Sequence, residues 1–255
     1  MQSEQPLKPA NILNIVATNQ GKRPLTTHIP KAEPLTAHTV QEQRQIGVSI
    51  IDTRSSASYG AGHIPGAINI QIASGEFEQR VGWMIPDNNK IILVTGKDEE
   101  AQAAIYKLAF VALDRQVLGY LKGGFTAWLN AGQLVATVQQ MDVHTLHNRL
   151  STNGLQVIDV RSKDEWHDFH IETAHFLPYT NMVQQLEQPS QLPTLNLTTD
   201  QKIAVTCATG KRSSTAISIM RQNGFQHLYN VTGGMEAWKS AKLPMVDGQG
   251  NICKF

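Results

Sequence analysis

A cysteine followed by small and basic residues is the part of this sequence whose residue types best fit chemistry. The stretch IAVTCATGKRSS places Cys207 directly after an apolar run typical of a buried strand, and Gly210, Lys211 and Arg212 follow closely. In open parallel α/β sheets, ligands bind at the carboxyl ends of the strands. Loop amides and the N-terminus of a following helix both stabilise an anion there. The pattern therefore predicts a nucleophilic thiolate at the base of an anion-binding loop.

The second cysteine lacks these surroundings. Cys253 lies close to the C-terminus, away from any glycine-containing basic loop, and we expect an incidental thiol there. A lone cysteine after a strand is more often a small buried hydrophobe. What favours chemistry at Cys207 is the combination of strand end, glycine, two basic residues and a following helix pattern. Two cysteines are also too few for a disulfide scaffold, which indicates a reducing compartment.

Composition bounds the class of protein. The chain has 255 residues, 41% of them apolar, and a net charge of +1. This is enough apolar sequence for one large or two small domains, without a charge excess that would attract nucleic acid or a membrane surface. No signal-peptide pattern opens the sequence, and no apolar run approaches the roughly 18 residues of a membrane span. We expect a cytoplasmic protein with neither nucleic acid nor membrane as partner.

The elements that must position the cysteine loop occur twice. VSIIDTRSSASYGAGHIPGAINI at Val48–Ile70 matches LQVIDVRSKDEWHDFHIETAHFL at Leu155–Leu177, and a Gly-Gly-x-x-Ala-Trp segment recurs at Gly123 and Gly233. In the second copy, Gln156–Val160 and Lys202–Thr206 are typical of buried strands. Ser213–Asn223 has helical spacing, with Gly224 at its end. Alternating strands and helices predict parallel sheets with helical crossovers.

These boundaries predict three parts. Residues 1–34 form an N-terminal extension of undetermined structure, residues 35–136 a first α/β domain, and residues 141–248 a second. Ala136–Met141 is expected to be a short linker.

At this point the motifs resemble the rhodanese family. CATGKRS resembles its active-site loop, and VIDVRSKDEW, HIETAHFLP and TGGMEAWKSAKLP follow the order of its other motifs, twice along most of the chain. The resemblance implies two tandem rhodanese-like domains, each a parallel sheet flanked by helices. It also implies that Cys207 carries sulfane sulfur as a persulfide. The residues expected to cradle the persulfide and its donor are Ala208, Thr209, Gly210, Lys211, Arg212 and Ser213.

The first copy is predicted to be inactive. Aligning IILVTGKDEE with IAVTCATGKR puts Gly96 at the position of Cys207, and Asp98, Glu99 and Glu100 bring negative charge in place of basic residues. Such carboxylates suit a helix start but repel an anionic donor. The tandem arrangement with a silent first copy, and the segment NILNIVATNQGKRPL, further resemble bacterial proteins that fuse rhodanese units to a persulfide dioxygenase domain. Such a domain is a candidate partner.

Asp159 and Arg161 recur as Asp52 and Arg54, which favours a supporting structural role. A strand-end aspartate accepts loop N–H bonds, and we expect Arg161 to pair with a following carboxylate such as Glu165. The Gly-Gly pairs lack the Lys-Ser/Thr of a phosphate loop. No cofactor motif and no ligand set for a metal is present, so neither is expected.

The sequence thus predicts a sulfurtransferase. Its donor would be a small anion such as thiosulfate or a low-molecular-weight persulfide, and its acceptor a thiol, cyanide or a protein. Two alternatives remain. One is a sulfur-carrying or partner-docking module with little small-molecule turnover. The other is a cysteine phosphatase, disfavoured because C-x4-R is one residue shorter than the C-x5-R that wraps a phosphate.

Overall fold

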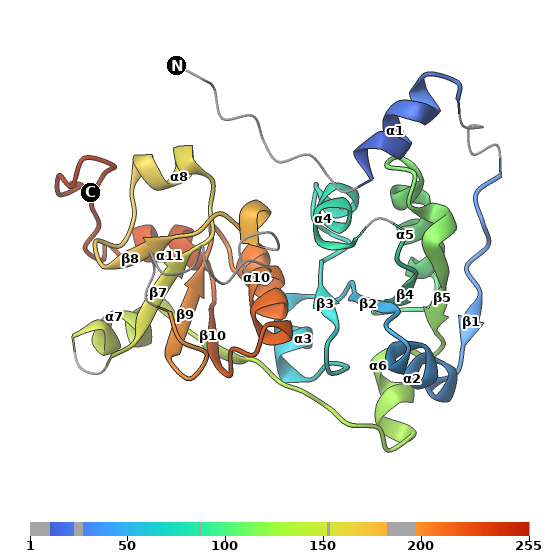
Figure 1. Cartoon of the computed structure of the whole chain (residues 1–255). Helices are drawn as coiled ribbons and strands as arrows, with labels where there is room; N and C mark the ends of the chain where they lie inside the picture. The colour runs from blue at the N-terminus through green and yellow to red at the C-terminus, as the bar shows by residue number, and fades with distance from the viewer. Residues whose placement is uncertain (1–10, 23–27, 87, 152–153, 183–196, 255) are drawn as a thin grey trace. The chain divides into compact units, whose positions relative to one another are not determined.

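The computed structural model describes residues 11–22, 28–86, 88–151, 154–182 and 197–254 (Figure 1). Contacts divide the chain into two compact units. The first contains the described residues up to Arg54 together with His63–Ala136. The second contains Ser55–Gly62 and the described residues from Thr137 onward.

The first repeat is built on a five-stranded parallel sheet in the order β1-β5-β4-β2-β3. Its strands are β1 (Pro34–Leu35), β2 (Ser49–Asp52), β3 (Ile68–Asn69), β4 (Ile91–Val94) and β5 (Val117–Leu121). Its helices are α1 (Ile12–Asn19), α2 (Ala37–Gln45), α3 (Ser56–Ala61), α4 (Phe77–Met84), α5 (Glu100–Ala109), the 3-10 helix η1 (Asp114–Gln116) and α6 (Gly124–Asn130).

The second repeat has the same topology, β6-β10-β9-β7-β8, again with every pairing parallel. Its strands are β6 (Gln139–Met141), β7 (Gln156–Asp159), β8 (Ala174–Phe176), β9 (Lys202–Thr206) and β10 (His227–Val231). Its helices are α7 (Val143–Leu150), α8 (Lys163–Asp168), α10 (Lys211–Gln222) and α11 (Gly234–Ser240). The predicted class, two α/β units with parallel sheets, is confirmed.

Two sequence expectations change. Gln139–Met141 was assigned to the linker, but these residues form β6 and pair with β10, so they belong to the second sheet. The predicted N-terminal extension contains α1, and its last residue, Pro34, begins β1 of the first sheet. Residues 1–10 and 23–27 of that extension lie outside the described residues.

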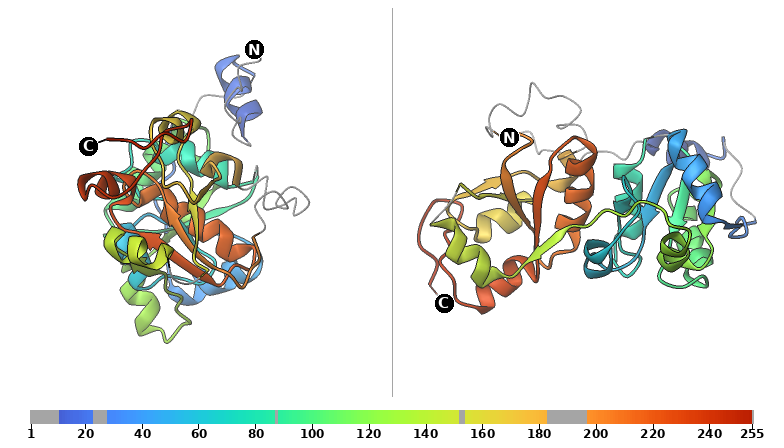
Figure 2. Two further views of the ribbon diagram at one scale, coloured as in Figure 1. Left: turned by 90° about the vertical axis from the view of Figure 1, so that its left-hand side faces the viewer. Right: turned by 90° about the horizontal axis from the view of Figure 1, so that it is seen from below.

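The core of the second unit explains why its strands are continuous apolar runs. Helices α7 and α11 pack on one face of the sheet and α10 lies on the other, so both faces are covered (Figure 2). Ile203, Ala204 and Val205 of β9 are fully buried as a result. Parallel strands buried on both faces carry apolar side chains at successive positions. Trp238 anchors α11, and its indole N–H donates to the Pro244 carbonyl at 2.9 Å.

The Gly-Gly pair lets α11 approach the cysteine loop. Gly234 has φ +54°, in the left-handed region, and a Cβ there would lie 2.6 Å from the Ala208 carbonyl oxygen and closer still to that of Cys207. Because the position has no side chain, the amides of Met235 and Glu236 donate to the Cys207 and Ala208 carbonyls at 2.7 and 3.0 Å. Only glycine meets both requirements.

Replacing Gly234 therefore tests how the loop is held. We expect Gly234→Ala to lower the free energy of unfolding by about 2 to 3 kcal/mol, because left-handed strain and a backbone clash add together. The matched control is Gly250→Ala, where φ is +84° but no atom lies within 4 Å of an added Cβ. It should cost only about 1 kcal/mol of conformational strain. Equal losses in urea unfolding would show that the close approach does not matter.

Candidate functional site

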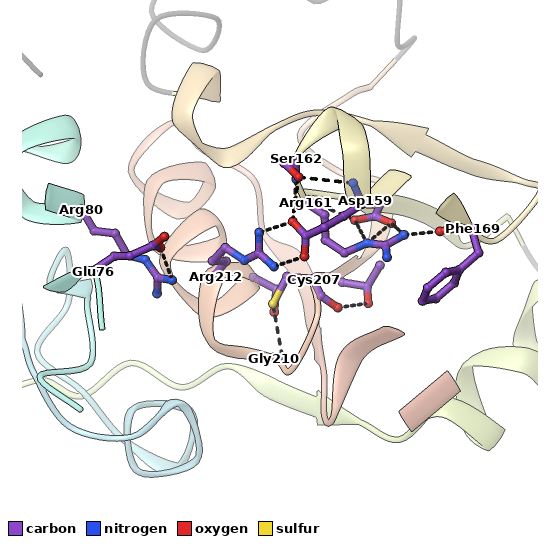
Figure 3. A network of polar contacts seen from close by, with 12 residues as sticks. Glu76, Arg80, Asp159, Arg161, Ser162, Phe169, Cys207, Gly210 and Arg212 are labelled. Atoms are coloured by element: carbon purple, nitrogen blue, oxygen red, sulfur yellow. Dashed lines mark hydrogen bonds and ion pairs between the residues drawn. The ribbon is translucent and has the colours of Figure 1, made fainter. Parts of the chain in front are cut away.

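Cys207 lies where the sequence predicts it, directly after β9 and before α10. Its side chain is buried, with 1% of the residue exposed. The Gly210 amide donates to Sγ at 3.2 Å (Figure 3). The thiol also lies 3.6 Å from the Ser213 hydroxyl. The sulfur therefore sits at the base of a loop that turns back over it, in contact with one donor and one hydroxyl oxygen.

Gly210 gives the loop its shape. It caps the N-terminus of α10 with φ +88°, and an added Cβ would lie 3.1 Å from the Val231 carbonyl oxygen. No side chain caps this helix end. The first amides of a helix have no partner within the helix and carry a partial positive charge. The turn at Gly210 thus leaves amides and the helix dipole near the sulfur.

The remaining loop amides are oriented through their carbonyls. The Cys207 and Ala208 carbonyls accept hydrogen bonds from α11. In a trans peptide the N–H points opposite to the C=O, so the amides of Ala208 and Thr209 point away from α11. Within the described part of the chain neither amide has a hydrogen-bond partner. These free donors suit an anionic ligand.

Arg212 is held in an ion pair. Its guanidinium donates to both oxygens of Glu165 on α8, at 2.6 and 2.5 Å (Figure 3). Burial would raise the pKa of Glu165, but hydrogen bonds from Arg212 and Ser162 outweigh it and hold that pKa at about 2. Burial would likewise lower the pKa of Arg212, and the Glu165 carboxylate raises it instead. Arg212 therefore orders the loop against α8 and offers little free charge to a substrate.

Lys211 provides the exposed positive charge of the loop. It is the first residue of α10, and among the described residues its ammonium group makes no ion pair. Thr209 is exposed, Ala208 is half-buried and Ser213 is buried. All six predicted cradle residues therefore lie in one turn around Cys207, with different exposures.

The pairing predicted for Arg161 is wrong. Arg161 pairs with the buried Asp159, 2.7 Å from its Oδ2, and donates to the Phe169 carbonyl at 2.6 Å. Both partners are buried at the end of β7. Their separation of two residues lets one carboxylate accept from the backbone and the side chain of the same arginine. Glu165 is thereby left for Arg212.

The first unit repeats this pair as Asp52 and Arg54. Burial raises the pKa of Asp52, against the lowering effect of Arg54. The recurrence of the pair in a unit without a cysteine fits the predicted supporting role.

The sequence analysis did not predict the contacts that two site residues make. Glu165 completes a capping box with Ser162, so its Ser-x-x-Glu pattern was readable as a helix start but not as a partner for Arg212. Asn230 at the end of β10 accepts a hydrogen bond from the Ser213 hydroxyl at 2.6 Å. A single asparagine in a strand carries no sequence signal for such a contact.

Strand register also corrects the alignment of the two copies. Asp52 pairs with Val94 and the equivalent Asp159 with Thr206, so the position of Cys207 corresponds to Thr95 rather than Gly96. The glycines of α6 and α11 agree: an added Cβ on Gly124 would meet the Thr95 carbonyl, as one on Gly234 would meet that of Cys207.

Carboxylates accept hydrogen bonds from the backbone amides around this strand end. Glu100 accepts from the Gly96 and Lys97 amides at 3.0 and 3.4 Å, and Asp98 accepts from the Gly123 amide at 2.9 Å. The first unit thus satisfies its strand-end amides internally, without a thiol.

Among the described residues, no helix combines the length and the apolar composition that a membrane span requires. No group of three or more histidine, cysteine, aspartate or glutamate side chains in those ranges could hold a metal ion.

Comparison with known proteins identifies relatives of both units. The family model of the rhodanese-like domain matches residues 36–131 and again residues 142–241. The chain is 30% identical over 105 residues to the thiosulfate sulfurtransferase GlpE of Vibrio cholerae, covering 41% of this chain and 92% of that protein. It is 31% identical over 123 residues to Protein HIGH ARSENIC CONTENT 1, mitochondrial, of Arabidopsis thaliana, covering 46% of this chain and 72% of that protein.

Among solved structures, the rhodanese-like domain of an Anabaena protein, solved by NMR, is 28% identical with a TM-score of 0.37. That match covers 42% of this chain and 78% of the solved one.

The ion pair between Arg212 and Glu165 makes a pH prediction. The Glu165 carboxyl has a pKa of about 2 in the folded protein against its usual 4.5. Its stabilising contribution is therefore complete above about pH 4.5 and is lost as the pH falls towards 2. Relative to wild type, Glu165→Gln should lower the free energy of unfolding at neutral pH by about 1 kcal/mol, because solvent screens a partly exposed pair.

Urea unfolding should show this difference shrink between about pH 5 and about pH 3, since wild type loses the contribution there. Glu172→Gln, an exposed carboxylate of the same unit, serves as the control and should show no such convergence. A difference that stays constant across this range would contradict the pairing.

Proposed function

Since the chain belongs to the rhodanese family, with two rhodanese-like domains in tandem, we propose that it is a sulfurtransferase with a single active site, at Cys207. The observation that carries the proposal is the buried sulfur of Cys207 beneath a loop of amides, one of which donates to it at 3.2 Å. The family relationship and the thiosulfate sulfurtransferase relative support sulfur transfer as the type of reaction. The donor, the acceptor and the roles of individual residues are part of the proposal.

In the forward step the Cys207 thiolate attacks the outer sulfur of thiosulfate. The sulfur–sulfur bond of the donor breaks, its electron pair leaves with sulfite, and Cys207 becomes a persulfide. A low-molecular-weight persulfide would react in the same way and release a thiolate. Nucleophilic catalysis of this kind divides the transfer into two easier steps.

The second step discharges the persulfide. The acceptor, which is cyanide, a thiolate or a protein thiol, attacks the terminal sulfur. The bond between the two sulfurs breaks, and Cys207 regains its thiolate. The free amides of Ala208 and Thr209 and the amide of Gly210 stabilise negative charge on the outer sulfur during both steps.

Lys211 is the residue that attracts the anionic donor, because Arg212 is neutralised by Glu165. This pairing also argues against a phosphatase, whose arginine must bind the phosphate itself. The resemblance to dioxygenase fusion proteins stays a prediction.

Cysteine variants test the proposal directly. After brief incubation with thiosulfate, intact-protein mass spectrometry should show the gain of one sulfur atom in wild type, lost on adding cyanide. Cys207→Ser should show no gain, and Cys253→Ser, the matched control, should behave as wild type. A gain that survives Cys207→Ser would overturn the assignment. Persulfide formation with discharge only to a partner protein, and none to cyanide, would identify a sulfur-carrying module instead.

The role of Lys211 makes a second prediction. Lys211→Ala should raise the KM for thiosulfate roughly five- to tenfold, about the value of one lost charge contact, and leave kcat nearly unchanged. Lys202→Ala removes the same charge at the first residue of β9, the strand that ends just before Cys207. The KM of this control variant should stay at the wild-type value. The effect should weaken as salt is added. Equal KM values for the two variants would exclude Lys211 from donor binding.

A further inference from the structure

A chain of polar side chains connects the buried sulfur of Cys207 to β6, an edge strand of the sheet. The thiol lies 3.6 Å from the Ser213 hydroxyl, which donates to the Asn230 side-chain oxygen at 2.6 Å. The Asn230 amide nitrogen donates to the Gln140 side-chain oxygen at 2.9 Å. Ser213 and Asn230 are at most 1% exposed. The links from Cys207 to Ser213 and from Ser213 to Asn230 are therefore shielded from water, where hydrogen bonds are strong and costly to break, whereas Gln140 is exposed.

The orientation of the Asn230 amide follows from its neighbours. Its nitrogen lies 3.2 Å from the carbonyl oxygen of Gly210, which can only accept a hydrogen bond. The nitrogen must face that carbonyl, so the side-chain oxygen faces Ser213. Because this oxygen can only accept, the Ser213 hydroxyl must donate to it.

We infer that Asn230 is a positioning residue that holds the Ser213 hydroxyl proton away from Cys207, so that this hydroxyl meets the sulfur as an acceptor. The inference rests on the proposed function for its catalytic meaning. A hydroxyl has one proton, and that of Ser213 is committed to Asn230 at 2.6 Å. The lone pairs of Ser213 then favour the S–H form of Cys207 and oppose the thiolate. The Gly210 amide is the donor that favours the thiolate.

This arrangement fixes the positions of the thiol proton and the hydroxyl proton when the thiolate forms. The thiol proton leaves the Cys207–Ser213 contact for solvent, and Ser213 keeps its own proton on Asn230. The terminal sulfur of the persulfide is then stabilised by loop amides rather than by the hydroxyl. Removing the Asn230 oxygen frees the hydroxyl to rotate and donate to the thiolate, since hydroxyl hydrogens turn to suit their partners.

Gln140 holds Asn230 in place from β6, the edge strand next to β10. The Asn230 nitrogen also bonds Gly210, so the same side chain fixes the glycine turn over the sulfur. One asparagine thereby sets both the position of the loop donor and the direction of the hydroxyl.

Other charged and titratable groups around the site are left unchanged by substitutions at Asn230 and Ser213. They are Arg212 and Lys211 on α10, Glu165 on α8, the Asp159–Arg161 pair at the end of β7, and Tyr179. A pH effect of these substitutions therefore reports the hydroxyl contact or the Gly210 amide, and the Ser213→Ala background separates the two.

The test is a titration of thiolate absorbance in the ultraviolet, in full-length protein carrying Cys253→Ser so that only Cys207 contributes. The same protein with Cys207→Ser supplies the baseline. Asn230→Ala should move the titration midpoint down by about one pH unit, because the thiolate gains a hydrogen bond from Ser213. Asn230→Asp should move it up, because a carboxylate holds the hydroxyl proton and adds negative charge.

Ser213→Ala completes a double-mutant cycle with Asn230→Ala. In the Ser213→Ala background, Asn230→Ala should cause no further shift, because no hydroxyl is left to reorient. Asn223→Ala is the matched control: Asn223 caps the C-terminus of α10, its side chain donates to the Ile219 carbonyl, and the midpoint should stay at the wild-type value. Thermal unfolding checks that each variant is folded; where Asn230→Ala is not, the Asn230→Asp shift decides.

Midpoints that do not move, or that move in the same direction for Asn230→Ala and Asn230→Asp, would overturn the inference and leave Asn230 a packing residue. The titration uses no sulfur donor. A protein that shows opposite shifts but forms no persulfide with thiosulfate would therefore contradict the proposed function and not the role of Asn230.

Discussion

The hydrogen bonds from the first amides of α11 to the carbonyls of Cys207 and Ala208 determine the geometry on which the site depends. They turn two peptide planes so that their N–H groups point away from α11, where an anion can use them. The contact requires a glycine at 234, because any side chain would collide with those carbonyls. The Gly-Gly pair is thus a structural requirement for the binding loop in the neighbouring segment, although it contacts no ligand itself.

Charge at this site is local and mostly dipolar. The chain as a whole carries a net charge of +1, and the arginine of the loop is neutralised by Glu165. What remains for a small anion is a set of amides, one helix N-terminus and the exposed Lys211. Fixed dipoles need no rearrangement when charge moves, which is the property that the proposed sulfur transfer requires.

The two repeats separate what the fold needs from what the chemistry needs. Both have the same strand order, an Asp–Arg pair whose buried aspartate ends β2 or β7, and a glycine pair before a helix anchored by tryptophan. They differ where the strand meets the loop. Thr95 occupies the position of Cys207, and Glu100 and Asp98 bind amides with their own carboxylates. The two loops therefore differ by a few residues at a strand end while the architecture stays the same.

The sequence by itself determined the repeat, the parallel α/β class and the place of Cys207 at a strand end, because apolar periodicity and glycine positions are local properties of the chain. It even placed β9 at Lys202–Thr206 and the end of α10 before Gly224. Only the tertiary structure decided which charged side chains form ion pairs. Arg161 pairs with Asp159, and Arg212 pairs with Glu165, 47 residues away in sequence, because burial and geometry select among several possible partners. The alignment of Cys207 with Thr95, and the contact of Ser213 with Asn230, likewise depend on strand register and on packing between segments distant in sequence.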